Sequence, residues 1–142
     1  MIYNDIIISG GGIKGISIVG AIERFFKFNN IETINKFCGS SAGGIISLLI
    51  IVGYTPSELK DIFLNLDFTK YRDIKFSNIV DNYGLDNGEK IMNLIKAMLL
   101  TKDIDTNINF LNLYNKFNKE LHITGSCISK EEVTYFNHMN TP

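Results

Sequence analysis

The sequence has few cysteines, few prolines and no excess of charge of either sign. Its two cysteines, Cys38 and Cys127, are too few for a disulfide framework. Two prolines and the lack of a long polar tract argue against disorder and against a linker-joined array of domains. Fourteen basic residues against fifteen acidic ones leave a net charge of -1, so we expect no nucleic-acid partner. The 142 residues allow one domain or part of a larger one.

Long hydrophobic runs and targeting segments are also lacking. The longest apolar stretch, residues 45–52, is far shorter than the roughly 20 residues that span a bilayer. The N-terminus has no basic region before its first apolar run, which argues against a signal peptide. We therefore expect a cytoplasmic protein with no transmembrane segment.

Short apolar runs alternate with helical patterns in the first half of the chain, which predicts an α/β fold. Residues 6–8 and 34–38 have the length and composition of buried strands. Residues 14–28 carry apolar side chains at helical spacing, and residues 44–52 are apolar on every side, as in a buried helix. This order implies a mainly parallel central sheet flanked by helices, and we expect helices on both of its faces.

The second half of the chain predicts further helices followed by two strands. Thr55 and Glu58 have the spacing of a capping box around Pro56, which marks the start of a helix. Residues 67–87 show no regular pattern. The remaining predicted elements are helices near 89–99 and 110–117, and strands at 121–128 and 133–136 joined by a tight turn.

A glycine-rich loop connects the first predicted strand to the first predicted helix. Its backbone can approach another group closely, and its N–H groups near a helix N-terminus can bind an anion. The loop also fits the pattern G-x-G-x-x-G of dinucleotide sites, and a glycine turn without a ligand is a further interpretation. A dinucleotide site needs an acidic residue at the end of the second strand, whereas Glu32 precedes that strand. The loop consists of Gly10, Gly11, Gly12, Ile13, Lys14 and Gly15.

A second glycine motif follows the second predicted strand and fits G-x-S-x-G, with Ser41 at its centre. In this motif the serine occupies a strained strand-to-helix turn that lifts its Oγ above the sheet. The positions two before and two after the serine must be small because neighbouring backbone passes close to them. The alternative interpretation is a polar turn between strand and helix that has no catalytic role. The motif consists of Gly39, Ser40, Ser41, Ala42 and Gly43.

The two motifs are more specific together than either is alone. One helix connects their strands, so we expect both loops to lie at the carboxyl edge of a parallel sheet. A nucleophilic serine needs backbone donors that face the tetrahedral oxyanion. The glycine-rich loop on the neighbouring strand can supply such donors, and the N–H of Ala42 adds another. The helix that starts at Ala42 also points its positive end at the reacting centre.

These two motifs resemble those of the patatin-like phospholipase family. Weaker similarity runs through residues 53–56, 83–85 and 133–136, so the resemblance covers essentially the whole chain. Family members are serine acyl hydrolases that act on phospholipids and other lipid esters. The resemblance implies a patatin-like three-layer sandwich, with Ser41 as the nucleophile and with Gly11 and Gly12 in the oxyanion hole, to which we expect the N–H of Ile13 to contribute. The basic position of the glycine loop is more often arginine in the family, and Lys14 keeps the charge but loses the planar fork.

The sequence departs from the family in its catalytic base. The family pairs the serine with an aspartate in an Asp-Gly-Gly or Asp-Gly-Ala motif well beyond the serine, and no Asp-Gly pair occurs in this sequence. We therefore expect residues 1–142 to be the N-terminal part of a single patatin-like domain, truncated before that aspartate. The chain by itself is expected to be weakly active or inactive, because a serine without its base loses most of its rate.

Some residues within the chain are alternative partners for the serine. Asp81 and Asp86 lie near glycines, where turn formation and helix capping are their ordinary roles. His122 lies in an alternating strand and His138 in a polar tail, which does not favour a Ser-Asp-His triad. The histidines and cysteines show no ligand spacing, so we expect no metal and no cofactor. Cys38 is expected to pack as a small buried residue.

The sequence therefore predicts a lipid acyl hydrolase in which Ser41 forms an acyl-enzyme that water clears. A lipid or phospholipid substrate implies transient contact with a membrane surface through apolar loops. Lys14 has the charge to organise the glycine loop or to favour an anionic head group. Two alternatives stay open. One is a catalytically incomplete remnant that binds lipid or a partner, and the other is a nucleotide-binding module that uses residues 10–15.

Overall fold

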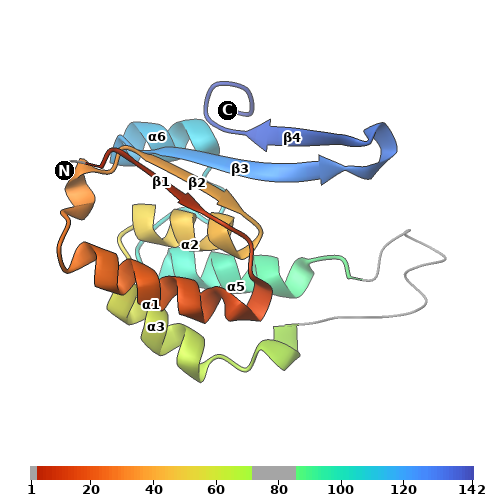
Figure 1. Ribbon diagram of the computed structural model, residues 1–142. Coiled ribbons are helices and arrows are strands. Elements are labelled where there is room, and N and C mark those ends of the chain that lie inside the picture. The colour runs from red at the N-terminus through yellow and green to blue at the C-terminus, as the bar shows by residue number, and fades with distance from the viewer. Residues whose placement is uncertain (1–2, 72–85) are drawn as a thin grey trace.

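A four-stranded sheet forms the upper layer of the molecule in Figure 1, a computed structural model that describes residues 3–71 and 86–142. The three strands β1, β2 and β3 are parallel, and β4 pairs with β3 in the antiparallel direction. The mainly parallel sheet flanked by helices is thereby confirmed. In spatial order the strands are β1 (Asp5–Ile8), β2 (Lys36–Ser40), β3 (Glu120–Cys127) and β4 (Glu132–Phe136).

The helices follow the predicted order. Short 3-10 turns occur at Gly12–Lys14, Ile31–Thr33, Phe68–Tyr71 and Ile128–Lys130. Among the described residues, no helix has the length and apolar character needed to cross a membrane. The α-helices are α1 (Gly15–Phe26), α2 (Ala42–Ile51), α3 (Pro56–Asn65), α5 (Glu89–Leu100) and α6 (Phe110–Phe117).

Helix α3 begins at the predicted capping box. The Thr55 hydroxyl accepts a hydrogen bond from the Glu58 backbone N–H at 3.2 Å, and the Glu58 carboxylate accepts one from the Thr55 N–H at 2.7 Å. Pro56 occupies the first helical position, where its missing N–H costs nothing. These local signals explain why the start of this helix is readable from sequence.

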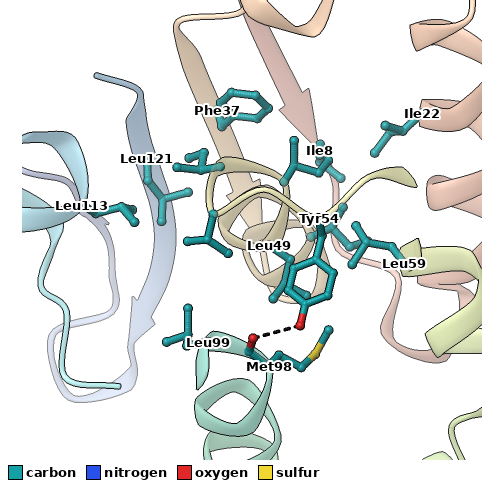
Figure 2. Close-up of a cluster of buried hydrophobic side chains, with 14 of the residues drawn as sticks. Ile8, Ile22, Phe37, Leu49, Tyr54, Leu59, Met98, Leu99, Leu113 and Leu121 are labelled. Carbon is teal, nitrogen blue, oxygen red and sulfur yellow. Dashed lines mark hydrogen bonds between the residues drawn. The ribbon is translucent and has the colours of Figure 1, made fainter. Parts of the chain in front are cut away.

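The hydrophobic core lies between the sheet and α2. Ile8, Phe37 and Leu121, one from each parallel strand, are buried on the face toward this helix (Figure 2). Helix α2 is buried on nearly all sides, and Ile46 and Leu49 have no exposed surface. An apolar helix with no polar face is stable only in such a sandwiched position, as its sequence predicts.

The opposite face of the sheet differs from the expectation of helices on both faces. Helices α1, α2, α3 and α5 all lie on one side of the strands (Figure 1). On the other face Asp5, Lys36 and Glu120 form one row across three strands, and the side chain of Ile7 is 82% exposed. Around Ile7 and this charged row, the face is therefore not covered by α1, α2, α3 or α5.

Strand β2 lies two residues later than the predicted range 34–38. Ile34 follows directly on the 3-10 turn Ile31–Thr33, and its N–H donates to the Ile31 carbonyl. Gly39 and Ser40 instead continue the ladder and pair with Ile123 and Thr124 of β3. Long-range pairing, which local pattern does not reveal, therefore sets the bounds of this strand.

Candidate active site

Ser41 forms a sharp turn between β2 and α2. The strand ends at Ser40, the helix begins at Ala42, and Ser41 itself has φ 50° and ψ -123°. A side chain is strained at this backbone conformation, which persists only where the surrounding structure enforces it. The Ser41 carbonyl accepts the N–H of Gly44 at 3.0 Å and that of Ile45 at 3.3 Å, so α2 starts immediately. The residue remains exposed at the positive end of that helix.

The glycines on either side of Ser41 allow backbone to pass at contact distance. A Cβ added to Gly39 would lie 2.4 Å from the Gly44 nitrogen, and one added to Gly43 would lie 2.2 Å from the Ile8 carbonyl oxygen. Both distances are shorter than non-bonded atoms tolerate. The glycine requirement of the motif therefore has a steric cause, because α2 packs directly on the ends of β1 and β2.

The glycine-rich loop lies beside Ser41 at the carboxyl edge of the sheet. A Cβ added to Gly10 would lie 3.3 Å from the Ser41 Cβ, and one added to Gly15 would lie 3.6 Å from the Ala42 Cβ. The loop continues as the 3-10 turn Gly12–Lys14, with Gly12 at φ 52°. Two strands that are neighbours in the sheet thus bring the two motifs together.

The turn in this loop uses some of its own donors. The Lys14 N–H donates to the Gly11 carbonyl at 3.0 Å, and the Gly15 N–H donates to the Gly12 carbonyl. These two N–H groups therefore point back into the turn. Neither of these two groups is therefore available as a donor toward Ser41.

An apolar cavity of about 230 Å³ opens next to Ser41. The glycine loop, α1, α2, α3, α5 and Tyr71 form its wall. Among the described residues that line it, Ser41 and Tyr71 carry the only side-chain oxygens, and none is aspartate, glutamate or histidine. Sequence reasoning missed the contribution of α5, although its apolar positions 91, 94, 95 and 98 share one helical face.

Of the two aspartates considered from the sequence, the structure describes Asp86. Asp86 accepts the Gly88 N–H at 2.8 Å in the turn before α5, which is the turn-forming role expected of it. Asp81 and the similarity at 83–85 lie outside the described residues. Asp86 is not among the described residues that line the cavity beside Ser41.

The histidines lie away from that cavity. His122 points to the face of the sheet that is turned away from α2, which we call the open face. There its Nε2 lies 2.8 Å from a Glu120 carboxylate oxygen. This hydrogen bond, helped by nearby Lys36, lowers the pKa of Glu120. The His138 ring stacks on Tyr114 with centroids 4.2 Å apart. Both histidines therefore have structural partners rather than a place beside Ser41.

Cys38 is half-buried in β2, directly opposite His122 of β3. Burial raises the pKa of its thiol, so the neutral thiol is favoured over the reactive thiolate. Over the residues that the structure describes, no group of three or more histidine, cysteine or acidic residues is arranged to hold a metal ion.

Glu32 does not fit the role of an acidic residue in a dinucleotide site. It lies in the 3-10 turn Ile31–Thr33, before β2 begins at Lys36. The glycine loop follows the last residue of β1, Ile8, which pairs with Gly39 near the end of β2. Because the strands are parallel, Glu32 and the glycine loop lie at opposite ends of the sheet, and the nucleotide-binding alternative loses its expected ribose partner.

Comparison with known proteins identifies the family. A family model described as patatin-like phospholipase matches residues 6–141. The chain belongs to this family. The patatin-like chain is 31% identical to the probable lipid hydrolase 463L of Invertebrate iridescent virus 6, over 99% of the chain and 49% of that protein. It is 33% identical to the uncharacterized protein YqhO of Bacillus subtilis, over 72% of the chain and 38% of that protein. The chain thus spans about half the length, or less, of these curated relatives.

Solved structures share the same fold. The crystal structure of the type III effector protein ExoU matches with a TM-score of 0.66 at 14% identity, over 96% of the patatin-like chain and 36% of that chain. ExoU in complex with SpcU from Pseudomonas aeruginosa matches with a TM-score of 0.64 at 20% identity, over 99% of the chain and 36% of that chain. The patatin-like chain therefore shares the α/β fold of these solved structures.

Proposed function

We propose that this protein is a serine lipid acyl hydrolase in which the Ser41 hydroxyl attacks an ester carbonyl. The observation that carries the proposal is the strained, exposed position of Ser41 at the mouth of an apolar cavity. Attack forms a tetrahedral oxyanion, whose collapse releases the alcohol and leaves an acyl-enzyme. Water then attacks the acyl-enzyme, releases the carboxylic acid and restores the hydroxyl.

The glycine loop is proposed to stabilise the oxyanion. Gly10 lies beside Ser41, and the 3-10 turn of the loop uses the N–H groups of Lys14 and Gly15. We therefore assign the donor role to Gly11, Gly12 and Ile13. The N–H of Ala42, in the first turn of α2, is a further donor because helices leave these groups without internal partners. Lys14 is exposed and organises the loop or attracts an anionic head group.

The base is proposed to come from sequence beyond this chain. No described residue that lines the cavity is acidic or imidazole-bearing, and the curated relatives are about twice as long as the chain. We therefore assign residues 1–142 to the N-terminal part of one patatin-like domain, with the partner aspartate in the remainder. A catalytically incomplete remnant that binds lipid is the second candidate, since the cavity could hold an acyl chain that is not hydrolysed.

Membrane contact is proposed at the end of the molecule where the cavity opens. Ile13 of the glycine loop and Ile91 at the start of α5 line the cavity and are 56% and 43% exposed. Leu64, near the end of α3, is also exposed. Apolar side chains on separate elements gain free energy by entering a lipid surface together. A cytoplasmic protein that binds membranes peripherally fits this arrangement.

A fluorophosphonate probe and a chromogenic short-chain ester, applied to the complete protein with its partner aspartate, test the proposed nucleophile. The probe is expected to label the protein once, detected by intact mass, and Ser41→Ala should abolish labelling and lower the ester rate at least about a hundredfold. Ser40→Ala is the matched control and should keep its labelling. Labelling or hydrolysis that survives Ser41→Ala would contradict the assignment, and lipid binding without any labelling would favour the remnant.

A further inference from the structure

We propose that the cavity beside Ser41 is an acyl-chain site for about eight to ten carbons, closed at its far end by Met98. This inference rests on the proposed function, because the acyl chain of the substrate would enter the cavity next to Ser41. It adds a length limit, and it names the residue that sets this limit.

Two helices form the long walls of the cavity. Helices α2 and α5 start at the same end of the molecule and run side by side beneath the sheet (Figure 1). Each contributes residues from successive turns, so the cavity extends along both helices. The wall residues on these turns are Ala42, Ile45 and Leu49 of α2, and Ile91, Ile95 and Met98 of α5.

The cavity is open at one end and closed at the other. At the start of the helices, Ser41 is exposed and Ile91 is 43% exposed. One or two turns later the lining residues are buried, with Met98 at 7% and Leu49 at 0% exposure. A linear apolar group would therefore enter beside the hydroxyl and point its free end toward Met98.

The helical walls give a first measure of the length. Leu49 lies seven positions after Ala42, and Met98 lies seven positions after Ile91, which is about 10 Å at roughly 1.5 Å per residue. An extended chain of single bonds advances about 1.2 Å per bond, since three backbone bonds span at most ~3.6 Å. The wall therefore accommodates about eight bonds.

The volume gives a second and independent measure. The cavity holds about 230 Å³, roughly half as much again as the ~150 Å³ apolar cavity that accepts the six carbons of benzene. Scaling the six carbons of benzene by this ratio of volumes gives about nine carbons. Both measures indicate an acyl group of medium length.

The closed end is held in place by hydrogen bonds. The buried Tyr54 hydroxyl donates to the Met98 carbonyl at 2.9 Å, as the dashed line in Figure 2 shows. The Thr101 hydroxyl donates to the same carbonyl at 2.8 Å. These bonds fix the backbone at this turn of α5, so a longer chain cannot be admitted by a shift of the helix end without breaking them.

Binding of free fatty acids to the Ser41→Ala protein tests this site without any need for catalysis. Isothermal titration calorimetry is run with the even-numbered saturated acids from hexanoate to hexadecanoate. The affinity should rise about fourfold per methylene up to octanoate or decanoate and then level off, because further carbons stay outside the cavity. An affinity that ignores chain length, or that keeps rising to hexadecanoate, would overturn the proposal.

Variants of the cavity test the role of Met98. Met98→Ala, added to Ser41→Ala, removes three heavy atoms from the closed end and should move the plateau about three carbons longer. Met92→Ala is the control on the same helix, because Met92 does not line this cavity. If Met98→Ala unfolds the protein, Ile95→Phe should instead move the plateau to shorter acids. An unmoved plateau in the folded variant would overturn the assignment, whereas fluorophosphonate labelling reports on Ser41 independently.

Discussion

Gly43, which has no side chain, fixes the geometry of the candidate site around Ser41. Its missing side chain makes room for the Ile8 carbonyl, which a Cβ would approach to 2.2 Å. The end of β1 and the first turn of α2 therefore touch at backbone level. Ser41 keeps its strained conformation because both neighbours of the turn are fixed in this way.

Gly43→Ala is expected to lower the free energy of unfolding by about 3 kcal/mol or more, because rigid backbone must move to admit the methyl group. Denaturant unfolding of the purified variant measures this loss. The matched control is Gly20→Ala in α1, where an added Cβ meets nothing within 4 Å. That change should leave stability equal or raise it by up to about 1 kcal/mol, and equal losses at both positions would contradict the packing described.

The glycine spacing around Ser41 was readable from the sequence because its cause is local. A strand, a turn and a helix follow each other within a few residues, and the small residues sit where backbone crosses. The cavity was not readable, because spacing alone does not say that Ile91 and Met98 of α5 would face Ala42 and Leu49 of α2. That pairing depends on how distant helices pack.

At the level of elements, Glu58 connects the capping box of α3 to an ion pair. Glu58 accepts hydrogen bonds from Thr55, and its other carboxylate oxygen lies 2.9 Å from the Lys102 ammonium. The backbone hydrogen bond from Thr55, followed by the bond from Lys102, lowers the pKa of Glu58 to about 2. The charged carboxylate thus links the start of α3 to the segment that follows α5.

Glu58→Ala is expected to reduce the free energy of unfolding by about 1 kcal/mol at neutral pH. Because the pKa of Glu58 is lower in the folded state, its stabilising effect is complete above the ordinary value of 4.5 and is lost as pH falls toward about 2. Chemical denaturation between pH 7 and about pH 2 should show the two proteins converging. Glu58→Gln keeps one acceptor oxygen and should lose less, and a difference that does not change with pH would refute this account.

Some elements follow from sequence alone, and others do not. Helix α6 occupies the predicted residues 110–117 because its apolar side chains recur at helical spacing and Asn109 caps its start. The shift of β2 by two residues could not be foreseen, since Gly39 and Ser40 are drawn into the strand by their partners in β3. Local pattern identifies an element, whereas pairing sets its ends.

For the whole molecule, the open face of the sheet is the feature that bears on association between copies of the chain. Ile7, Val133 and Tyr135 are exposed, with Ile7 on β1 and the other two on β4. Over the described residues these two strands form the edges of the sheet. The charged row of Asp5, Lys36 and Glu120 becomes apparent only once the register is known, which is why the sequence suggested helices on both faces.

The 142-residue chain is expected to self-associate at this face, because exposed edge strands and apolar side chains favour pairing between copies. Sedimentation velocity over a range of concentrations should show larger species, and Ile7→Lys should reduce them while changing the free energy of unfolding by less than about 0.5 kcal/mol. Leu100→Lys, at an exposed position on the last turn of α5, is the control and should not reduce them. A chain that stays monomeric at every concentration would show that this face is not adhesive.

The contact between Gly43 and Ile8 also bears on when the protein acquires its chemistry. The turn at Ser41 is braced from both sides only after the first strand has docked against the second and against α2. A chain whose N-terminal strand is detached loses that brace, so position 41 relaxes to an unremarkable surface hydroxyl. The geometry that we propose for the nucleophile therefore depends on the docking of β1.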